Sequence, residues 1–247
     1  MKPISPDHAS KQEIIDDLLK NLPSETAIEV SLPSECRAYN LPDPTAMITL
    51  RPMTFEDEKA LVSSEGTQDP INIILNRCCT NLNIAELLPM DKLYLIMKLR
   101  EISYGDDYNT VLICPNCKAE NPTKILLSQL NVNPVPDDFE DPITVSLPSL
   151  GKDAKVRLPR LKDEKYMKTT EDALNNIWRF VTQIDTYSDK QIIGSVLQKL
   201  PIKDMRVILK AMRTDYGVDT KIKFDCTSCH TQSIVELPID ANFFDVN

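Results

Sequence analysis

The two halves of this 247-residue chain carry the same motifs in the same order. At one constant offset and without gaps, residues of the first half recur in the second: Pro89 as Pro201, Tyr104-Gly105 as Tyr216-Gly217, Cys114 as Cys226 and Cys117 as Cys229. With other offsets, Val30–Ser34 recurs as Val145–Ser149 and Asp57–Lys59 as Asp163–Lys165. Chance explains such an ordered series poorly. The sequence therefore predicts two tandem repeats of one unit. This limits the chain to folds in which each half forms a similar structural unit.

Each predicted repeat contains a β-hairpin, helices and a Cys-x-x-Cys turn between two strands. Period-two alternation with prolines at the margins predicts strands at 28–32, 46–50, 143–147 and 155–158, and strands leave the cysteine turns at 124–127 and 233–237. Predicted helices lie at 70–79, 90–102, 171–184, 190–200 and 202–212. In each repeat we expect Tyr-Gly to end the second helix, because glycine accepts the left-handed conformation after the last turn. The predicted fold class is α+β, with the two repeats related by pseudo-twofold symmetry.

Composition sets the predicted domain boundaries. Residues 1–27 form a tail with an amphipathic helix, residues 28–132 form the first repeat with its cysteine turn at 114–117, and residues 143–247 form the second with its turn at 226–229. Between them, residues 133–142 contain three prolines and four acidic residues. Because this composition resists both helix and sheet, we interpret the segment as an acidic linker.

The cysteine pattern predicts a structural zinc site. Seven cysteines are an odd number, which argues against a fully paired disulfide framework, and four of them form the pairs Cys114/Cys117 and Cys226/Cys229. A Cys-x-x-Cys turn between two strands is typical of a zinc-ribbon knuckle, and two knuckles complete the tetrahedral four-sulfur site that zinc prefers. Since the pairs hold equivalent positions in the two repeats, pseudo-twofold symmetry would bring them together. Separate sites, or reduced thiols without metal, remain as alternatives.

Two other uses of the cysteines fit less well. Cys226 to His230 matches the c-type haem pattern, but the equivalent of His230 in the first repeat is Lys118. A dithiol redox site would place the pair at the start of a helix, whereas polar residues and Pro122 follow here. With only two histidines, His8 and His230, a catalytic set built on histidine is hard to assemble, and we expect no enzymatic activity.

The charge balance favours protein partners. A formal net charge of -9 repels phosphate backbones, so we expect no nucleic-acid binding. The glycines are not spaced as a nucleotide-binding loop requires. No apolar run reaches the length of a membrane span and no signal peptide is evident, so we expect an intracellular protein without membrane contact.

Both ends of the chain offer apolar side chains to a partner. Ser10 and Glu13 form a predicted capping box at the start of a helix over 10–22. The apolar face of this helix consists of Ile14, Ile15, Leu18, Leu19 and Leu22. This helix, like Phe243 and Phe244 at the other end, is expected either to pack on its own domain or to dock on a partner protein.

Several of these segments together resemble a known family. They are Arg51–Glu58, the helix from Pro89 into Asp106, Cys114–Cys117, Val156–Pro159 and Cys226–Cys229. The combination is similar to the baseplate hub and hub-assembly proteins of T-even-type contractile-tailed bacteriophages, from about residue 28 to the end. The resemblance implies a non-enzymatic role in building the tail baseplate in the host cytoplasm, with other hub proteins as partners.

The resemblance leaves several points open. It does not separate a hub component that stays in the virion from a transient, chaperone-like assembly factor, and it does not specify the oligomeric state. The alternative function is a zinc-ribbon protein that binds nucleic acid or acts with the transcription machinery.

Overall fold

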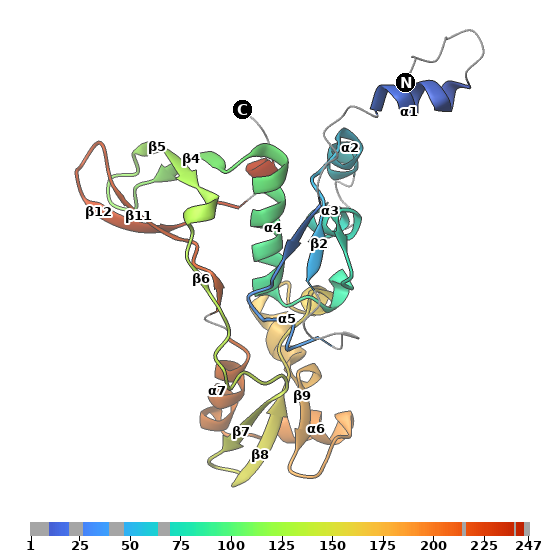
Figure 1. Cartoon of the computed structure of the whole chain (residues 1–247). Helices are drawn as coiled ribbons and strands as arrows, with labels where there is room; N and C mark the ends of the chain where they lie inside the picture. Colours follow the sequence, from blue (N-terminus) through green and yellow to red (C-terminus); the bar gives the residue numbers. More distant parts are fainter. Residues whose placement is uncertain are drawn as a thin grey trace.

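The computed structural model describes residues 10–19, 27–39, 47–63, 70–213, 216–239 and 241–244, and it combines helices with several small antiparallel sheets (Figure 1). The α-helices are α1 (Lys11–Leu19), α2 (Phe55–Ser63), α3 (Pro70–Cys78), α4 (Pro89–Tyr104), α5 (Thr170–Asn175), α6 (Lys190–Leu197) and α7 (Ile202–Ala211). The strands are β1 (Ile28–Val30), β2 (Ile48–Leu50), β3 (Cys79–Thr80), β4 (Asp107–Ile113), β5 (Glu120–Leu126), β6 (Val132–Asn133), β7 (Ile143–Leu147), β8 (Lys152–Val156), β9 (Val181–Ile184), β10 (Gly217–Val218), β11 (Lys221–Asp225) and β12 (Gln232–Glu236). None of the helices in these ranges has the length and apolar character that crossing a bilayer requires.

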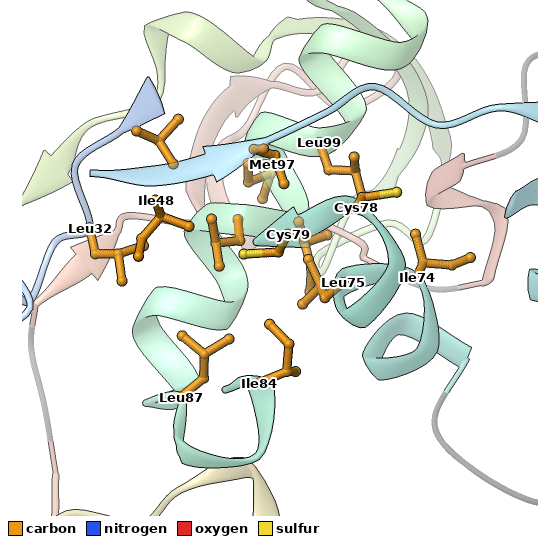
Figure 2. Close-up of a cluster of buried hydrophobic side chains, with 14 of the residues drawn as sticks. Leu32, Ile48, Ile74, Leu75, Cys78, Cys79, Ile84, Leu87, Met97 and Leu99 are labelled. Atoms are coloured by element: carbon orange, nitrogen blue, oxygen red, sulfur yellow. The ribbon is translucent and has the colours of Figure 1, made fainter. Parts of the chain in front are cut away.

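The larger core forms around the sheet β1–β2–β3 and the helices α3 and α4, which we call the first body. The alternation along β2 turns Ile48 and Leu50 inward, and both are fully buried. Figure 2 shows side chains of β2, α3 and α4 meeting there, with Leu75 from α3 and Leu99 from α4 among them. The first body thus has its own hydrophobic core.

Helix α4 runs through the first body and has clear start and stop signals. Pro89 occupies its first turn, where the missing N–H costs no helical hydrogen bond. Gly105 follows its last residue with a φ of 94°, and its N–H bonds to the Glu101 carbonyl at 3.0 Å. This end confirms the prediction that Tyr104-Gly105 ends this helix.

The second Tyr-Gly pair has a different role. Helix α7 ends at Ala211, well before Gly217, which starts β10 with a φ of 98°. A Cβ atom at Gly217 would lie 2.9 Å from the Cβ of Met90 on α4. The prediction of a helix-ending glycine is therefore wrong here, because a close approach to α4 is what requires this glycine.

The smaller core belongs to a second body made of the sheet β7–β8–β9 with α6 and α7. Strand β7 has the predicted bounds, 143–147. The predicted helix over 171–184 is wrong beyond α5, because a short 3-10 turn and then β9 replace it. Val181 and Ile184 are buried as β9 pairs with the edge of β8, so sheet pairing overrides the helical pattern.

The acidic segment 133–142 is packed between the two bodies. Its Val135 and Phe139 are buried, and β6, which includes its first residue, pairs with β10. The Arg37 guanidinium donates hydrogen bonds to the carbonyl oxygens of Pro136, Asp137 and Phe139 at 2.7–2.8 Å. Beyond Asn133 the segment forms no helix or strand, and Arg37 satisfies three of the carbonyls that a sheet would otherwise pair.

Matching segments of the two halves hold the same ion pair. Arg51 Nη1 lies 2.6 Å from Asp57 Oδ2, and Arg157 Nη1 lies 2.6 Å from Asp163 Oδ2. Both carboxylates are buried. In each pair the arginine is the residue that follows a core strand, β2 in the first pair and β8 in the second. The first of the two also accepts a hydrogen bond from Arg77 Nε at 2.6 Å, so one buried charge has two arginine partners.

We predict that Asp57→Ala lowers the free energy of unfolding by about 1.5–3 kcal/mol, because Arg51, Arg77 and the Thr54 N–H lose the buried carboxylate that accepts their hydrogen bonds. Urea unfolding followed by circular dichroism measures the loss. Asp107→Ala is the control, since Asp107 and its partner Lys124 are more than half exposed and their pair should contribute little. Equal stability of the two variants would contradict the prediction.

The same carboxylate makes stability depend on pH. Burial raises the pKa of Asp57, but hydrogen bonds from Arg51, the Thr54 N–H and Arg77 outweigh it and hold that pKa well below its usual range. The stabilisation is therefore present above the unfolded pKa of about 4 and is lost as the pH falls below it. The difference in stability between the wild type and Asp57→Ala should shrink accordingly in acid.

Candidate metal centre

The two Cys-x-x-Cys turns connect the strands of two hairpins, β4–β5 and β11–β12. Each hairpin is a regular antiparallel ladder, with Ile113 opposite Glu120 in the first and Asp225 opposite Gln232 in the second as the last pairs before the turn. Figure 1 shows the hairpins side by side, although more than a hundred residues separate the turns in sequence. The two cysteine pairs therefore face each other, as the sequence predicted.

Both turns have the same backbone geometry. The residue after the second cysteine is left-handed in each, with a φ of 62° at Lys118 and 55° at His230. Its N–H donates to the carbonyl of the first cysteine, at 3.0 Å to Cys114 and 2.9 Å to Cys226. This tight reversal brings the two sulfurs of each turn to the same side, which is what a shared metal ion requires.

The four sulfurs form a compact cluster with spacing suited to zinc. Cys114 Sγ lies 3.7 Å from Cys229 Sγ, Cys117 Sγ lies 3.6 Å from Cys226 Sγ, and all four lie within 4.8 Å of one another. A tetrahedron with zinc–sulfur bonds of about 2.3 Å has sulfur–sulfur edges of about 3.8 Å. The separations greatly exceed the disulfide bond length of about 2.05 Å, so the thiols are unpaired. The donor set and its spacing thus fit a four-coordinate zinc ion.

Hydrogen bonds inside the cluster prepare one thiolate. Donors from the Thr231 hydroxyl and N–H, followed by the Asn116 amide, lower the pKa of Cys229 to about 5. At Cys117 an N–H from Ala119 lowers the pKa, but the neighbouring cysteine sulfurs raise it to about 11. Without metal the cluster shares its protons unequally. Thiolates this close together repel one another. A divalent cation bound between them would offset that repulsion and hold all four cysteines deprotonated.

Asn121 links the two turns, and the sequence analysis missed it. Its Nδ2 donates to the Ala119 carbonyl at 2.9 Å, and its Oδ1 accepts hydrogen bonds from Thr227 N at 2.8 Å and Thr227 Oγ1 at 3.0 Å. The side chain is buried on the inner face of β5. The role of Asn121 could have been found from the strand pattern. Alternation along β5 places this polar residue at an inward position just after the cysteine turn, and buried Ser233 holds the matching position in the other hairpin.

The predicted partner-binding residues of the N-terminal helix are exposed. Ile14, Ile15, Leu18 and Leu19 have exposed fractions of 37%, 46%, 73% and 52% on α1. Leu22 lies outside the described residues. The capping box is confirmed, since Ser10 N donates to Glu13 Oε2 at 2.7 Å and Glu13 N donates to Ser10 Oγ at 3.3 Å. The predicted helix is thus confirmed over Lys11–Leu19, where its four apolar side chains are exposed.

The predicted partner-binding residues at the other end are core residues instead. Phe243 and Phe244 are 0% and 2% exposed and pack in the first body. The Phe243 ring meets Tyr108 edge to face with 4.9 Å between centroids, and its carbonyl accepts a hydrogen bond from buried Arg100 at 2.7 Å. Of the two alternatives that the sequence left open for Phe243 and Phe244, the structure therefore gives packing on the chain's own core.

Comparison with known proteins identifies a family for this chain. Residues 34–245, which include both cysteine turns, match the family model described as T4 bacteriophage base plate protein. Neither the curated proteins nor the solved structures give a match.

We predict that the purified chain holds one zinc ion and that Cys114→Ser or Cys226→Ser removes most of it, because a hydroxyl is a poor substitute for a thiolate ligand. Elemental analysis of reduced protein gives the zinc content per chain. Cys36→Ala, at a buried cysteine outside the cluster, should retain the ion. Wild-type protein without bound zinc would contradict the assignment.

We predict that Asn121→Ala speeds zinc release about 10–100-fold, because the two turns lose the amide that fixes their relative position. The rate is measured by transfer of zinc to a coloured chelator. The matched control is Asn131→Ala, since Asn131 is exposed and its side-chain amide donates to Asn133 Oδ1. Equal release rates for both variants would show that Asn121 does not support the site.

Proposed function

The chain belongs to the T4 bacteriophage base plate protein family, and from that premise we propose that it is a baseplate hub component or a chaperone-like hub-assembly factor. In this role it acts by protein–protein interaction and without catalysis. The observation that carries the proposal is the closed cluster of four cysteine sulfurs, since a zinc ion held there has no open position for substrate and serves to brace the fold.

The proposal is supported by the stability that a shared zinc ion would add to the two hairpins that carry the cysteine turns. A two-stranded hairpin gains little stability from its own ladder, and each cysteine turn lies at the end of such a hairpin. A metal ion shared by Cys114, Cys117, Cys226 and Cys229 would fasten them to each other. The result is a rigid surface of the kind that an assembly protein presents to its partners.

We also propose that the two halves arose by duplication. Support comes from contacts that recur at matching sequence positions, including the ion pairs Arg51–Asp57 and Arg157–Asp163 and the two left-handed residues after the cysteine turns. Duplication accounts for a four-cysteine site assembled from two distant pairs, because each unit contributes one half.

The non-enzymatic role rests on the sequence and on the resemblance to hub proteins. Only two histidines are available, and one of them, His230, lies in a cysteine turn with its side chain exposed. The proposed place of action is the host cytoplasm during tail assembly, with other hub proteins as partners. In this scheme α1, with its exposed apolar face, is a docking helix.

We predict that a tagged copy expressed during phage infection co-purifies with baseplate hub proteins, because assembly by contact requires a complex that survives isolation. Mass spectrometry identifies the captured proteins. Cys226→Ser should capture much less than Cys36→Ala, since only the first change removes a ligand of the scaffold. Immunoblotting of purified particles then separates a hub component, which is present, from an assembly factor, which is absent. Capture of no baseplate protein by the wild type would overturn the proposal.

A further inference from the structure

Strand β4 is one edge of the hairpin that carries the first cysteine turn. At the turn, Cys114 N donates to the Ala119 carbonyl at 3.0 Å. At the other end of the hairpin, Leu127 N donates to the Asp106 carbonyl at 3.1 Å. These bonds fix which pairs of the ladder are hydrogen-bonded, because such pairs alternate with non-hydrogen-bonded pairs between antiparallel strands. The odd-numbered residues of β4 therefore direct their N–H and C=O groups away from β5.

The outward backbone groups of β4 have no partner in the part of the chain that the structure describes. Among the described strands only β5 pairs with β4, and no hydrogen bond there involves the backbone of Asn109, Val111 or Ile113 on the outward side. A row of unpaired N–H and C=O groups along a strand edge is a template for another strand. The edge of β4 thus has its full hydrogen-bonding capacity available.

The other three edges of the two cysteine hairpins are protected against such pairing. On β5, the outward residue Pro122 has no N–H to donate. In the second hairpin, the same alternation places charged or polar side chains at nearly every outward position. These outward residues are Lys221, Lys223 and Asp225 on β11, and Gln232, Ile234 and Glu236 on β12. Charged side chains and proline are the usual means of blocking a strand edge.

Apolar side chains occupy the outward positions of β4 that are charged on β11. Val111 and Ile113 are 46% and 49% exposed, and the constant offset between the halves makes them the equivalents of Lys223 and Asp225. They lie on one face of the hairpin, where exposed Pro122 stands opposite Val111. Of two equivalent edges, one is therefore blocked by charge, and the other offers an apolar row to an added strand.

We infer that β4 of one copy of the chain pairs antiparallel with β4 of a second copy, with Val111 of each copy at the twofold axis. An added strand needs unpaired outward groups and alternating apolar side chains without charge, and β4 itself meets both conditions. Asn109 of each copy then stands opposite Ile113 of the other, and every outward N–H in this stretch meets an outward carbonyl. Pairing of this kind gives a closed, isologous dimer.

The exposed side chains identify a second copy as a fitting partner. In the resulting four-stranded sheet, the central row consists of Pro122 and Val111 from both copies, so apolar side chains meet apolar side chains. The next row begins at Glu120 of one copy and ends at Lys124 of the other, so no like charges face each other. The exposed face of the hairpin is thus complementary to itself.

The neighbouring registers fit less well. The next register in one direction sets Asn109 opposite Pro115, which has no N–H to complete the pair. The next register in the other direction sets the Asp107 carboxylate opposite the apolar side chain of Ile113. The register centred on Val111 is therefore the one that the edge of β4 specifies.

Sedimentation analysis of the reduced, full-length protein over a range of concentrations tests this inference. The wild type should approach twice its chain mass of 28.0 kDa. Val111→Lys introduces the residue type that β11 has at the equivalent position. It should weaken association at least about tenfold, because like charges then face each other at the twofold axis. Ile202→Lys is the matched control and should not change association, since Ile202 is 68% exposed on α7, which Figure 1 shows away from the hairpins.

A second variant, Val111→Glu, tests the register. Its charges also repel at the twofold axis, so alone it should associate as weakly as Val111→Lys. A mixture of the two variants places a lysine opposite a glutamate, and we expect it to associate more strongly than either variant alone. Circular dichroism verifies that each variant is folded. Failure of the folded variants to recover association on mixing would overturn the pairing of β4 with β4.

The remaining outcomes separate this inference from the proposed function, on which it does not rest. A wild type that stays monomeric at every concentration overturns the inference, whether the edge of β4 then binds another protein or stays free. A dimer that Val111→Lys does not weaken also overturns it, because the contact then lies elsewhere. If a monomeric wild type captures baseplate proteins, the proposed function stands. A dimer that captures none refutes that function and leaves the pairing of β4 intact.

Discussion

The convergence of four thiols at the ends of two hairpins is the constraint on which the architecture depends. Among the strands that the structure describes, none adds to the hairpins β4–β5 and β11–β12, so their ladders alone give little stability. Cys114 and Cys226 are buried where the turns meet, and Asn121 joins the turns from the inner side. Two hairpins that are distant in sequence are thereby held together at one point, with a geometry that fits a zinc ion.

The two bodies are joined by segment 133–142, which is ordered although it is rich in proline. Segment 133–142 lies against the first body through Val135 and Phe139, and Arg37 binds three of its carbonyls. The pairing of β6 with β10 adds a backbone link between the end of one predicted repeat and the middle of the next. A proline-rich sequence can therefore form an ordered connector when a neighbouring side chain supplies the missing hydrogen bonds.

The sequence revealed the parts of the fold that rest on local pattern or on repetition. Strand β7, helix α4 and the meeting of the cysteine turns followed from alternation, capping signals and matched motifs. The errors arose where contacts between distant segments decide the outcome: Val181 forms a strand because the edge of β8 is open to it, and Gly217 serves a close approach to α4. Asn121 was missed because its role depends on a turn that lies far away in sequence.

The last described turn of the chain, at 241–244, has a consequence for biosynthesis. Leu237, Phe243 and Phe244 fill the core of the first body, and Arg100 on α4 bonds to the Phe243 carbonyl. A ribosome that has made only the first half has therefore not yet supplied these side chains. The first body therefore remains incompletely packed until residues 237–244 have been synthesised, and products that terminate before Cys226 lack part of both its core and the thiol cluster.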